Sequence, residues 1–291
     1  AMPVLADVRP DTLNIDPHEI ERRITPRTRA LIPVHLAGQP CEMDEIQALA
    51  KEHGLLLIED AAHATGAEYR GRKIGTFGDV TVFSFYATKN LTTGEGGMIC
   101  TEDEDLAEKT RILRLHGISQ DAWKRYSDKG SWYYEVQLPG YKYNMTDIQA
   151  SLGLHQLARQ EEFLRVRERY ARVYTEAFAD LPEIRAPFVK DHVRHAWHLY
   201  IVQLNLERLT IDRGQFIEAL RGENVGTSVH FIPLHLHPFY QQEYGFKEGD
   251  YPVAEAAYEG IVSLPLYPRM TEEDVDDVVR AVKKVISRSR R

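Results

Sequence analysis

The sequence predicts an α/β protein, because short apolar runs that are typical of buried strands alternate with helix signals along its first half. Helices placed between such runs are the pattern of a mostly parallel sheet. The second half mixes helix and strand signals without this alternation, which predicts a smaller α+β domain. The chain has 291 residues, a length that suggests two domains with sizeable cores.

The first elements have clear start and stop signals. Asp16 followed by Pro17 is a helix start, since a carboxylate can cap the helix and proline suits its first position. Residues 1–8 read as a strand that is already under way, and residues 30–34 form the next predicted strand. A helical stripe of apolar residues then runs to Gly54, the residue type that most often ends a helix. Residues 55–60 are a continuous apolar run ending in acids, which suits a parallel strand buried on both faces.

The next part of the chain continues this pattern. Two more strands are predicted at residues 80–85 and 98–101, and a charged amphipathic helix at residues 103–116. Residues 126–134 are polar and aromatic. We therefore expect an exposed loop there, near the site described below.

A long helical pattern separates the two halves of the chain. It runs from residue 146 to about residue 181. We expect one helix, or two end to end, between a large cofactor-binding domain at residues 1–145 and a small domain at residues 182–291. The apolar residues predicted on the buried side of residues 146–181 are Ile148, Leu152, Leu157, Leu164, Tyr170 and Val173.

The small domain is predicted to hold two strands and two helices. The strands lie at residues 197–204 and 227–232, and the first helix at residues 212–221. Thr271 and the acids that follow it start a last amphipathic helix, because this pattern is typical of a capped N-terminus.

Composition excludes several classes of protein. Lys and Arg number 36 and Asp and Glu number 44, so the net charge is −8, whereas a nucleic-acid binder usually has a basic excess. The longest apolar runs, such as residues 55–58, are far too short to span a membrane. Only two cysteines are present, Cys41 and Cys100, and no signal peptide opens the chain. We therefore expect a cytoplasmic protein in a reducing compartment.

The candidate chemistry gathers between residues 58 and 97. Asp60 ends a predicted strand, and side chains at the carboxyl ends of strands in an open α/β sheet line the ligand crevice. Taken alone, Asp60 is equally a helix cap, and a single lysine such as Lys89 is most often a surface charge. Lys89, however, follows apolar and hydroxyl residues just after a strand. A lysine beside buried apolar surface can have a depressed pKa and form an imine.

A strand-end aspartate and a later loop lysine are the two protein groups that a pyridoxal phosphate site requires. The lysine forms the Schiff base, and the aspartate keeps the pyridinium nitrogen protonated so that the ring accepts electrons. Ser84 would donate a hydrogen bond to the phosphate. The glycine run at residues 94–97 lacks the spacing of a P-loop and is better explained as a tight turn before the next strand.

Several spaced motifs together resemble one known family. They are Ile58-Glu59-Asp60-Ala61-Ala62-His63, Gly75-Thr76-Phe77-Gly78-Asp79, Phe83-Ser84-Phe85 through Lys89, and Gly94-Glu95-Gly96-Gly97. In this order they resemble the DegT/DnrJ/EryC1/StrS family of pyridoxal-phosphate-dependent sugar aminotransferases, which have the aspartate-aminotransferase type I fold. Similarity at residues 34–38, 115–117, 140–144 and 229–231 extends the resemblance over nearly the whole chain.

The resemblance implies roles for individual residues. Lys89 matches the Schiff-base lysine, and Asp60 matches the partner of the pyridinium nitrogen. Ser84 matches the phosphate-binding serine. His63 stands where the family places Gln or His against the ring oxygen or the ring face of the cofactor, and Ala62 packs beneath the ring.

Other matching residues bear on the partner subunit and the substrate. Residues 140–144 read Gly-Tyr-Lys-Tyr-Asn instead of the more common Gly-Tyr-Asn-Tyr-Arg, so Lys142 stands where an Asn usually reaches the cofactor phosphate of the partner subunit. This variant resembles the UDP-4-amino-4-deoxy-L-arabinose aminotransferase branch. His198 and His230, in the motifs at 195–198 and 229–233, fit the same branch and are expected near the substrate.

The resemblance also implies the reaction. An amino acid, expected to be glutamate, would give its amino group to carbon 4 of a nucleotide-linked ketosugar, with Lys89 as general acid and base. The active site would lie between the subunits of a homodimer. Family members carry a further N-terminal part of the large domain with a phosphate-binding turn and a stacking aromatic ring. Nothing in this sequence matches that part, so we expect an N-terminally truncated member with an incomplete large domain.

Three alternatives remain open from the sequence. A sugar dehydratase of the same fold would carry His in place of Lys89. A non-catalytic fragment would fold and associate without binding the cofactor. A metal site at His230, His235 and His237 is conceivable, but no Cys or carboxylate stands at a supporting spacing, so no metal is expected.

Overall fold

The computed structural model describes residues 1–118 and 134–291, so nearly all of the loop predicted at 126–134 lies outside the described residues. The helices are α1 (Pro17–Arg23), α2 (Met43–His53), α3 (Glu104–Leu113), α4 (Asp147–Phe178), α5 (Arg213–Gly222), α6 (Pro238–Tyr244), α7 (Pro252–Gly260) and α8 (Glu272–Ser289). The strands are β1 (Ala30–Leu31), β2 (Leu56–Asp60), β3 (Glu68–Tyr69), β4 (Arg72–Lys73), β5 (Val80–Ser84), β6 (Gly97–Cys100), β7 (Ile184–Arg185), β8 (Val193–Arg194), β9 (Tyr200–Leu204) and β10 (Ile261–Leu264). Within these ranges no helix has the length and apolar character that crossing a bilayer requires.

A four-stranded sheet in the order β1-β2-β5-β6 forms the centre of the N-terminal half. β1 pairs with β2 and β2 with β5 in parallel, whereas β6 runs antiparallel to β5. The predicted α/β fold with a mostly parallel sheet is therefore confirmed. Because β2 and β5 are parallel neighbours, Asp60 at the end of β2 and Ser84 at the end of β5 lie at the same edge of the sheet.

The two faces of this sheet differ in burial. Leu57 of β2 is 3% exposed and joins a core cluster with Ile46 of α2. Its neighbour Leu56 is 57% exposed, and Val82 and Ile99 on the adjacent strands are also exposed. The prediction that β2 is buried on both faces is therefore wrong for the described residues, because no described segment covers the side chains that alternate to the far face.

The helix signals read from the sequence act as expected. The side chain of Asp16 accepts a hydrogen bond from the first turn of α1, and Pro17 occupies the first position of that helix. Gly54 ends α2 in the left-handed conformation with φ of 61°. Thr271 forms a capping box that starts α8. These three helix boundaries were set by local chemistry.

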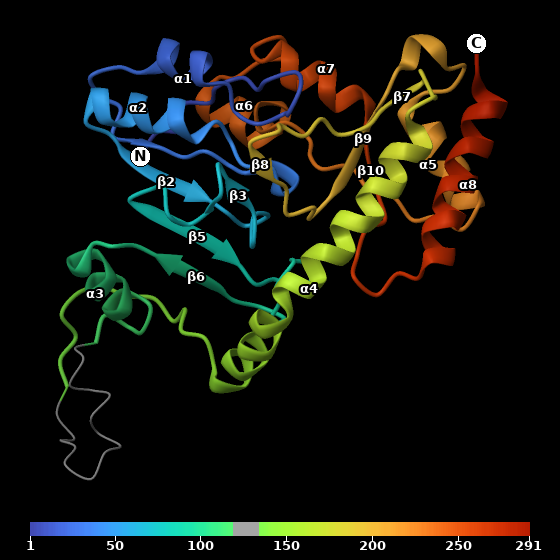
Figure 1. The fold of residues 1–291 in the computed structure, drawn as a ribbon. Coiled ribbons are helices and arrows are strands. Elements are labelled where there is room, and N and C mark those ends of the chain that lie inside the picture. The colour runs from blue at the N-terminus through green and yellow to red at the C-terminus, as the bar shows by residue number, and fades with distance from the viewer. Residues whose placement is uncertain (119–133) are drawn as a thin grey trace.

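Helix α4 is one continuous helix of 32 residues, which begins at a capping box formed by Thr146 and Gln149. Its C-terminal half packs into the core of the small domain, where Leu164, Tyr170 and Phe178 are buried. Figure 1 shows this half lying beside α8, while the N-terminal half runs past the start of β6.

The N-terminal half of α4 is exposed in the described residues. Ile148, Leu152 and Leu157 are 77%, 51% and 60% exposed. The prediction that these three residues line a buried side is therefore wrong here, because this half of the helix extends beyond the small-domain core that buries the other half (Figure 1).

The small domain is built on an antiparallel sheet in the order β10-β9-β7, packed against α5 and α8. The predicted strand at 197–204 begins only at Tyr200. The strand predicted at 227–232 is wrong, because the backbone leaves the sheet after one isolated bridge between Ser228 and Ser263. β10, which contains Ser263, was not predicted.

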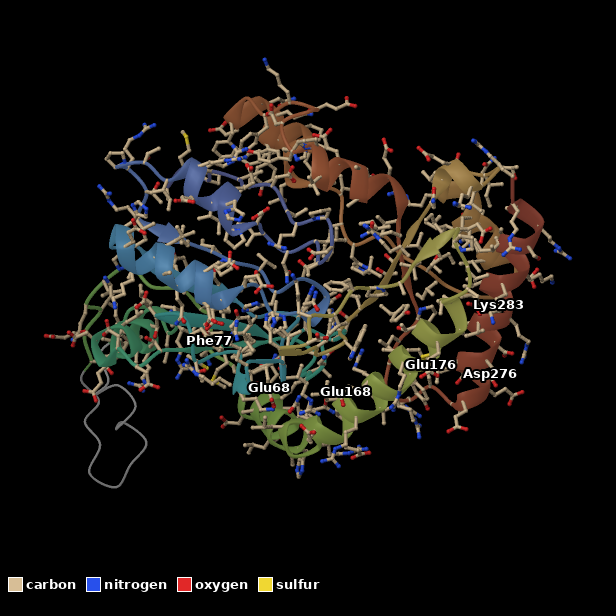
Figure 2. All side chains as sticks on the ribbon, turned by 45° about the horizontal axis from the view of Figure 1, so that its top comes forward. Glu68, Phe77, Glu168, Glu176, Asp276 and Lys283 are labelled. Carbon is tan, nitrogen blue, oxygen red and sulfur yellow. The ribbon has the colours of Figure 1, made fainter. Side chains whose placement is uncertain are left out.

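Two sets of contacts join the halves of the chain. β8 adds to β3 as an antiparallel neighbour, and its Arg194 binds Glu68, Glu161 and Glu168, the last two on α4. Figure 2 shows Glu68 and Glu168 near one another across this junction. Near the N-terminus, the Asp7 carboxylate accepts hydrogen bonds from the first backbone N–H groups of α7. The domain boundaries at residues 145 and 181 stay a prediction.

Candidate active site

Asp60 and Lys89 come together at the carboxyl edge of the sheet. Asp60 ends β2, and its Oδ1 accepts a hydrogen bond from the backbone N–H of Ala62 at 3.0 Å. Lys89 follows β5 in a turn that its own N–H closes on the Tyr86 carbonyl at 3.0 Å. Partial burial lowers the pKa of Lys89, and the nearby Asp60 carboxylate offsets this effect only in part. A half-buried amine with a lowered pKa suits a covalent role.

The glycine run after Lys89 forms the turn predicted from its spacing. The backbone N–H of Phe85 bonds to the Gly96 carbonyl at 2.8 Å, and the N–H of Thr93 bonds to the Phe85 carbonyl at 2.9 Å. Gly96 has φ of 146°, and a Cβ there would lie 2.7 Å from Thr93 Oγ1. Only glycine fits this position, so the loop returns directly into β6.

Three histidines from separate segments surround the lysine. The ring centroids of His63 and His198 lie 4.3 Å apart. The charge of Lys89 acts on both rings and on His230 as well. The structure therefore brings these four predicted site residues together, although His63 and His230 lie far apart in the sequence.

The histidines are held uncharged. Burial lowers the pKa of His63 to about 3 and the pKa of His198 to about 2, and the positive charge of Lys89 contributes to both shifts. Burial and Lys89 also lower the pKa of His230. At neutral pH the cluster thus offers ring nitrogens as hydrogen-bond donors and acceptors without placing further cations beside Lys89.

Asn90 connects the lysine loop to the segment that carries His198. Its Nδ2 donates to the Ala196 carbonyl at 2.7 Å, and its Oδ1 lies 3.1 Å from His198 Nδ1. Asn90 is 9% exposed. Sequence reasoning missed this residue, and its position directly after Lys89 was the one available signal.

A second buried group lies just behind the site. Glu59, the residue before the strand-end aspartate, is fully buried and accepts hydrogen bonds from Gly78 N–H at 2.8 Å and Thr81 Oγ1 at 2.7 Å. Phe77 N–H and His35 Nε2 also bond to its carboxylate, each at 3.2 Å. Burial would raise the pKa of Glu59, but these bonds hold it below its usual value. Glu59 therefore stays charged and ties the end of β2 to its neighbours.

Two other predicted residues lie at the margins of this cluster. Ser84 Oγ, at the end of β5, accepts a hydrogen bond from the Tyr86 N–H at 3.4 Å. Lys142 is exposed on a segment that pairs with Leu115, and its Nζ donates to Asn144 Oδ1. The structure does not bring Lys142 into the histidine cluster, and its reach toward a partner subunit stays a prediction.

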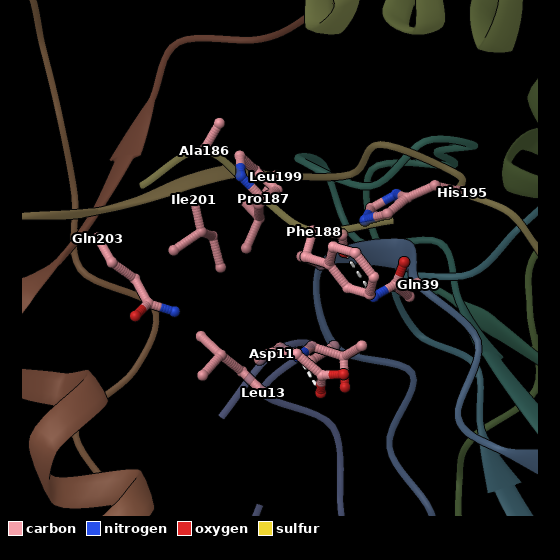
Figure 3. A pocket seen from close by; sticks show the side chains of 13 residues that line it. Asp11, Leu13, Gln39, Ala186, Pro187, Phe188, His195, Leu199, Ile201 and Gln203 are labelled. Atoms are coloured by element: carbon pink, nitrogen blue, oxygen red, sulfur yellow. Dashed lines mark hydrogen bonds between the residues drawn. The ribbon is translucent and has the colours of Figure 1, made fainter. Parts of the chain in front are cut away.

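A small pocket lies beside the site but cannot hold a cofactor. Ala37 lines it, and the Ala37 N–H also bonds to His63 Nδ1 at 3.2 Å. Figure 3 shows Gln39, Phe188 and His195 around this space. Its volume of about 30 Å³ suits one or two water molecules, whereas ligand pockets measure hundreds of Å³.

Metal chemistry finds no support in this part of the structure. Among residues 1–118 and 134–291, no group of three or more His, Cys, Asp or Glu side chains is arranged to hold a metal ion. His235 instead places Nε2 2.6 Å from the Glu255 carboxylate.

The fold and the site together define a pyridoxal-phosphate-dependent enzyme with the type I aminotransferase fold. The residues present fit this cofactor, because a half-buried lysine with a lowered pKa lies near a strand-end carboxylate and two uncharged imidazoles. A serine hydroxyl at the same sheet edge suits a phosphate.

Comparison with known proteins gives the family. The model of the DegT/DnrJ/EryC1/StrS aminotransferase family matches residues 1–283, and the chain belongs to this family. It is similar to the Uncharacterized protein MJ1066 of Methanocaldococcus jannaschii, with 61% identity over all of this chain and 75% of that protein. It is also similar to the spore coat polysaccharide biosynthesis protein SpsC of Bacillus subtilis, with 55% identity over 98% of this chain and 74% of SpsC.

A solved structure agrees with this membership. Spr1654 from Streptococcus pneumoniae, assigned as a sugar aminotransferase, superposes in its PMP form with a TM-score of 0.91 and 34% identity, over 99% of this chain and 77% of that one. The same protein in its PLP form gives a TM-score of 0.88. The chain is thus a PLP-dependent sugar aminotransferase by family and fold, and it spans about three quarters of these relatives.

Proposed function

We propose that this chain transfers an amino group from an amino acid, glutamate, to carbon 4 of a nucleotide-linked ketosugar in polysaccharide biosynthesis. The observation that carries the proposal is the half-buried Lys89 amine, whose pKa is lowered, beside the Asp60 carboxylate. The polysaccharide context is supported by the 55% identity to SpsC.

Lys89 and Asp60 would perform the central steps. When bound, the cofactor supplies an aldehyde and a ring that accepts an electron pair. Lys89 would hold it through Nζ and then move the proton at the reacting substrate carbon, because a lowered pKa favours the uncharged amine that can accept this proton. Asp60 would keep a proton on the ring nitrogen.

Other residues would orient the cofactor. The Ala37 N–H donates to His63 Nδ1, so the proton of this uncharged ring is on Nε2 and can be donated to a ring oxygen. Ala62 would pack beneath the ring, and Ser84 would bond the phosphate. In a homodimer, Lys142 would reach the cofactor phosphate of the partner subunit.

His230 and His198 would face the substrate. His230 Nδ1 lies 2.7 Å from Ser263 Oγ, which fixes the ring orientation. Both rings are held uncharged, so they suit sugar hydroxyls as hydrogen-bond partners. The free thiols of Cys41 and Cys100 fit a reducing compartment and support a cytoplasmic location.

One observation favours a second candidate function, a non-catalytic chain that associates without the cofactor. The far face of the sheet, with Leu56, Val82 and Ile99, is exposed in the described residues, and large exposed apolar patches often mark association surfaces. A sugar dehydratase is disfavoured, since a lysine and not a histidine stands at position 89.

A titration with pyridoxal phosphate, followed by visible absorbance, separates these candidates. We expect a yellow complex in which borohydride fixes the cofactor to Lys89. Lys89→Ala should remove this label, whereas Lys51→Ala on the exposed side of α2 should keep it. A colourless chain, or a label on another lysine, would contradict the proposed role of Lys89.

The substrate is tested separately with protein that has bound the cofactor and has not been treated with borohydride. Glutamate should change the absorbance of the bound cofactor to that of its pyridoxamine form and release 2-oxoglutarate. A nucleotide-linked 4-ketosugar should then restore the original absorbance. Restoration by a 3-ketosugar alone would contradict the carbon 4 assignment but would leave the aminotransferase class unchanged.

A further inference from the structure

We propose that Asn90 is a positioning residue that fixes both the place of Lys89 and the tautomer of His198. This inference rests on the proposed role of Lys89, but its geometry can be tested without the cofactor. It follows from two hydrogen bonds of the Asn90 side chain. They connect the loop that carries Lys89 to Ala196 and His198, which lie 106 and 108 positions later in the sequence.

The orientation of the Asn90 amide is fixed by its first partner. The Ala196 carbonyl can only accept, and it lies 2.7 Å from Asn90 Nδ2. A flipped amide would place Oδ1 against this carbonyl, with two acceptors in contact. The atom that faces His198 Nδ1 at 3.1 Å must therefore be Oδ1.

This orientation determines where His198 carries its proton. Oδ1 can only accept, so His198 Nδ1 must be the donor. The ring is uncharged, because burial and the positive charges of Lys89 and Arg167 lower its pKa to about 2. The lone pair is thus on Nε2, and His198 presents an acceptor to the site.

His63 is the opposite tautomer. Its Nδ1 accepts the Ala37 N–H at 3.2 Å, so its Nε2 carries the proton. The two rings, 4.3 Å apart, therefore offer one donor and one acceptor nitrogen near Lys89.

Asn90 also limits the movement of the lysine. Lys89 is half-buried, and its next residue is buried and anchored through the side chain to the 196–198 segment. The burial that lowers the Lys89 pKa depends on this loop position, while the Asp60 carboxylate acts in the other direction. Release of the loop would expose the amine and raise its pKa.

The tautomer can be measured in the unaltered 291-residue chain. Long-range ¹H–¹⁵N correlation spectra of histidine-labelled protein distinguish a protonated Nδ1 from a protonated Nε2. We expect His198 to carry its proton on Nδ1 at pH 7.5, with assignment through His198→Gln. A proton on Nε2 would overturn the inference, whatever the stability of any variant.

Two substitutions of Asn90 separate its roles. Asn90→Asp keeps an acceptor toward His198 and should retain the Nδ1 proton, whereas Asn90→Ala should lose it. In Asn90→Ala the midpoint of the pH profile for competitive acylation of Lys89 should rise. A rise of one unit lowers the reactive fraction at pH 7.5 about tenfold.

Asn14→Ala is the matched control, because Asn14 is also buried and also bonds to backbone groups, at Gln39, Pro40 and Leu36. It should lower the melting temperature without moving the Lys89 midpoint. An unchanged Lys89 midpoint in folded Asn90→Ala, or an equal shift in Asn14→Ala, would overturn the positioning role. Absence of the borohydride label at Lys89 would instead contradict the proposed function and leave the tautomer result standing.

Discussion

Replacement of Glu59 by Gln should destabilise the fold strongly although it changes one buried atom. The Glu59 carboxylate accepts four hydrogen bonds, and one comes from His35 Nε2. His35 Nδ1 already accepts the Cys41 N–H at 3.0 Å, so the His35 proton is fixed on Nε2. In Glu59→Gln the new amide N–H groups would meet this N–H, and two donors would be left facing each other.

The magnitude follows from the geometry. The lost bond to a charged group contributes about 1.5–3 kcal/mol, and a buried donor without an acceptor costs about 1–3 kcal/mol more. Together the two terms predict that the free energy of unfolding falls by about 2.5–6 kcal/mol. Urea titrations at pH 7 measure this difference.

The pH dependence gives an independent check. The folded pKa of Glu59 is held below its ordinary value of 4.5, so the contribution of Glu59 to stability is complete above about pH 4.5 and is lost as the pH falls through the folded value. The wild-type chain should therefore lose stability in acid more steeply than Glu59→Gln. Glu162→Gln, on an exposed pair with Arg159, should leave the stability nearly unchanged, because exposed ion pairs contribute little. A Glu59→Gln loss no larger than this control would refute the reasoning.

Three further predictions concern the site and its support. Asp60→Asn should leave the cofactor bound but slow transamination by on the order of a hundredfold, because an amide cannot hold the ring proton; unchanged turnover at saturating donor would contradict this. As the pH is lowered from about 6.5, His63 and His198 should each reduce the free energy of unfolding by about 1.4 kcal/mol per pH unit. The reason is that the unfolded rings take up protons in this range, whereas the folded rings stay uncharged to about pH 3 and pH 2. Stability that is flat from pH 6.5 to 5 would contradict this. Arg194→Ala should lower the free energy of unfolding by about 1–2 kcal/mol at low salt and by less at high salt, because three carboxylates share a partly exposed guanidinium. A loss of stability that does not depend on salt would point to packing instead.

The sequence predicted those features whose cause is local. Asp60 and Lys89 could be placed at the sheet edge because Asp60 ends one strand and Lys89 follows another within a few residues. Gly54 and Thr271 mark helix ends through their own backbone preferences. The contact between Asn90 and His198 could not be predicted, since it depends on how two distant loops pack.

The errors have the same origin. The strand predicted at 227–232 failed because its alternating residues had no strand to pair with beyond Ser228. Ile148 and Leu157 were assigned to a buried side because they match the helical period, but periodicity does not show whether a neighbour is present. Tertiary neighbours decided these cases.

The cap that Asp7 provides for α7 has a consequence for synthesis on the ribosome. The N–H of Val253, which binds the Asp7 carboxylate, is 246 positions later in the chain. At about 5–20 residues per second, roughly 12–50 s pass between the emergence of the two groups. During this time the Asp7 carboxylate lacks its two bonds to the backbone of α7. Nascent-chain proteolysis should therefore cut near residue 7 until α7 has emerged.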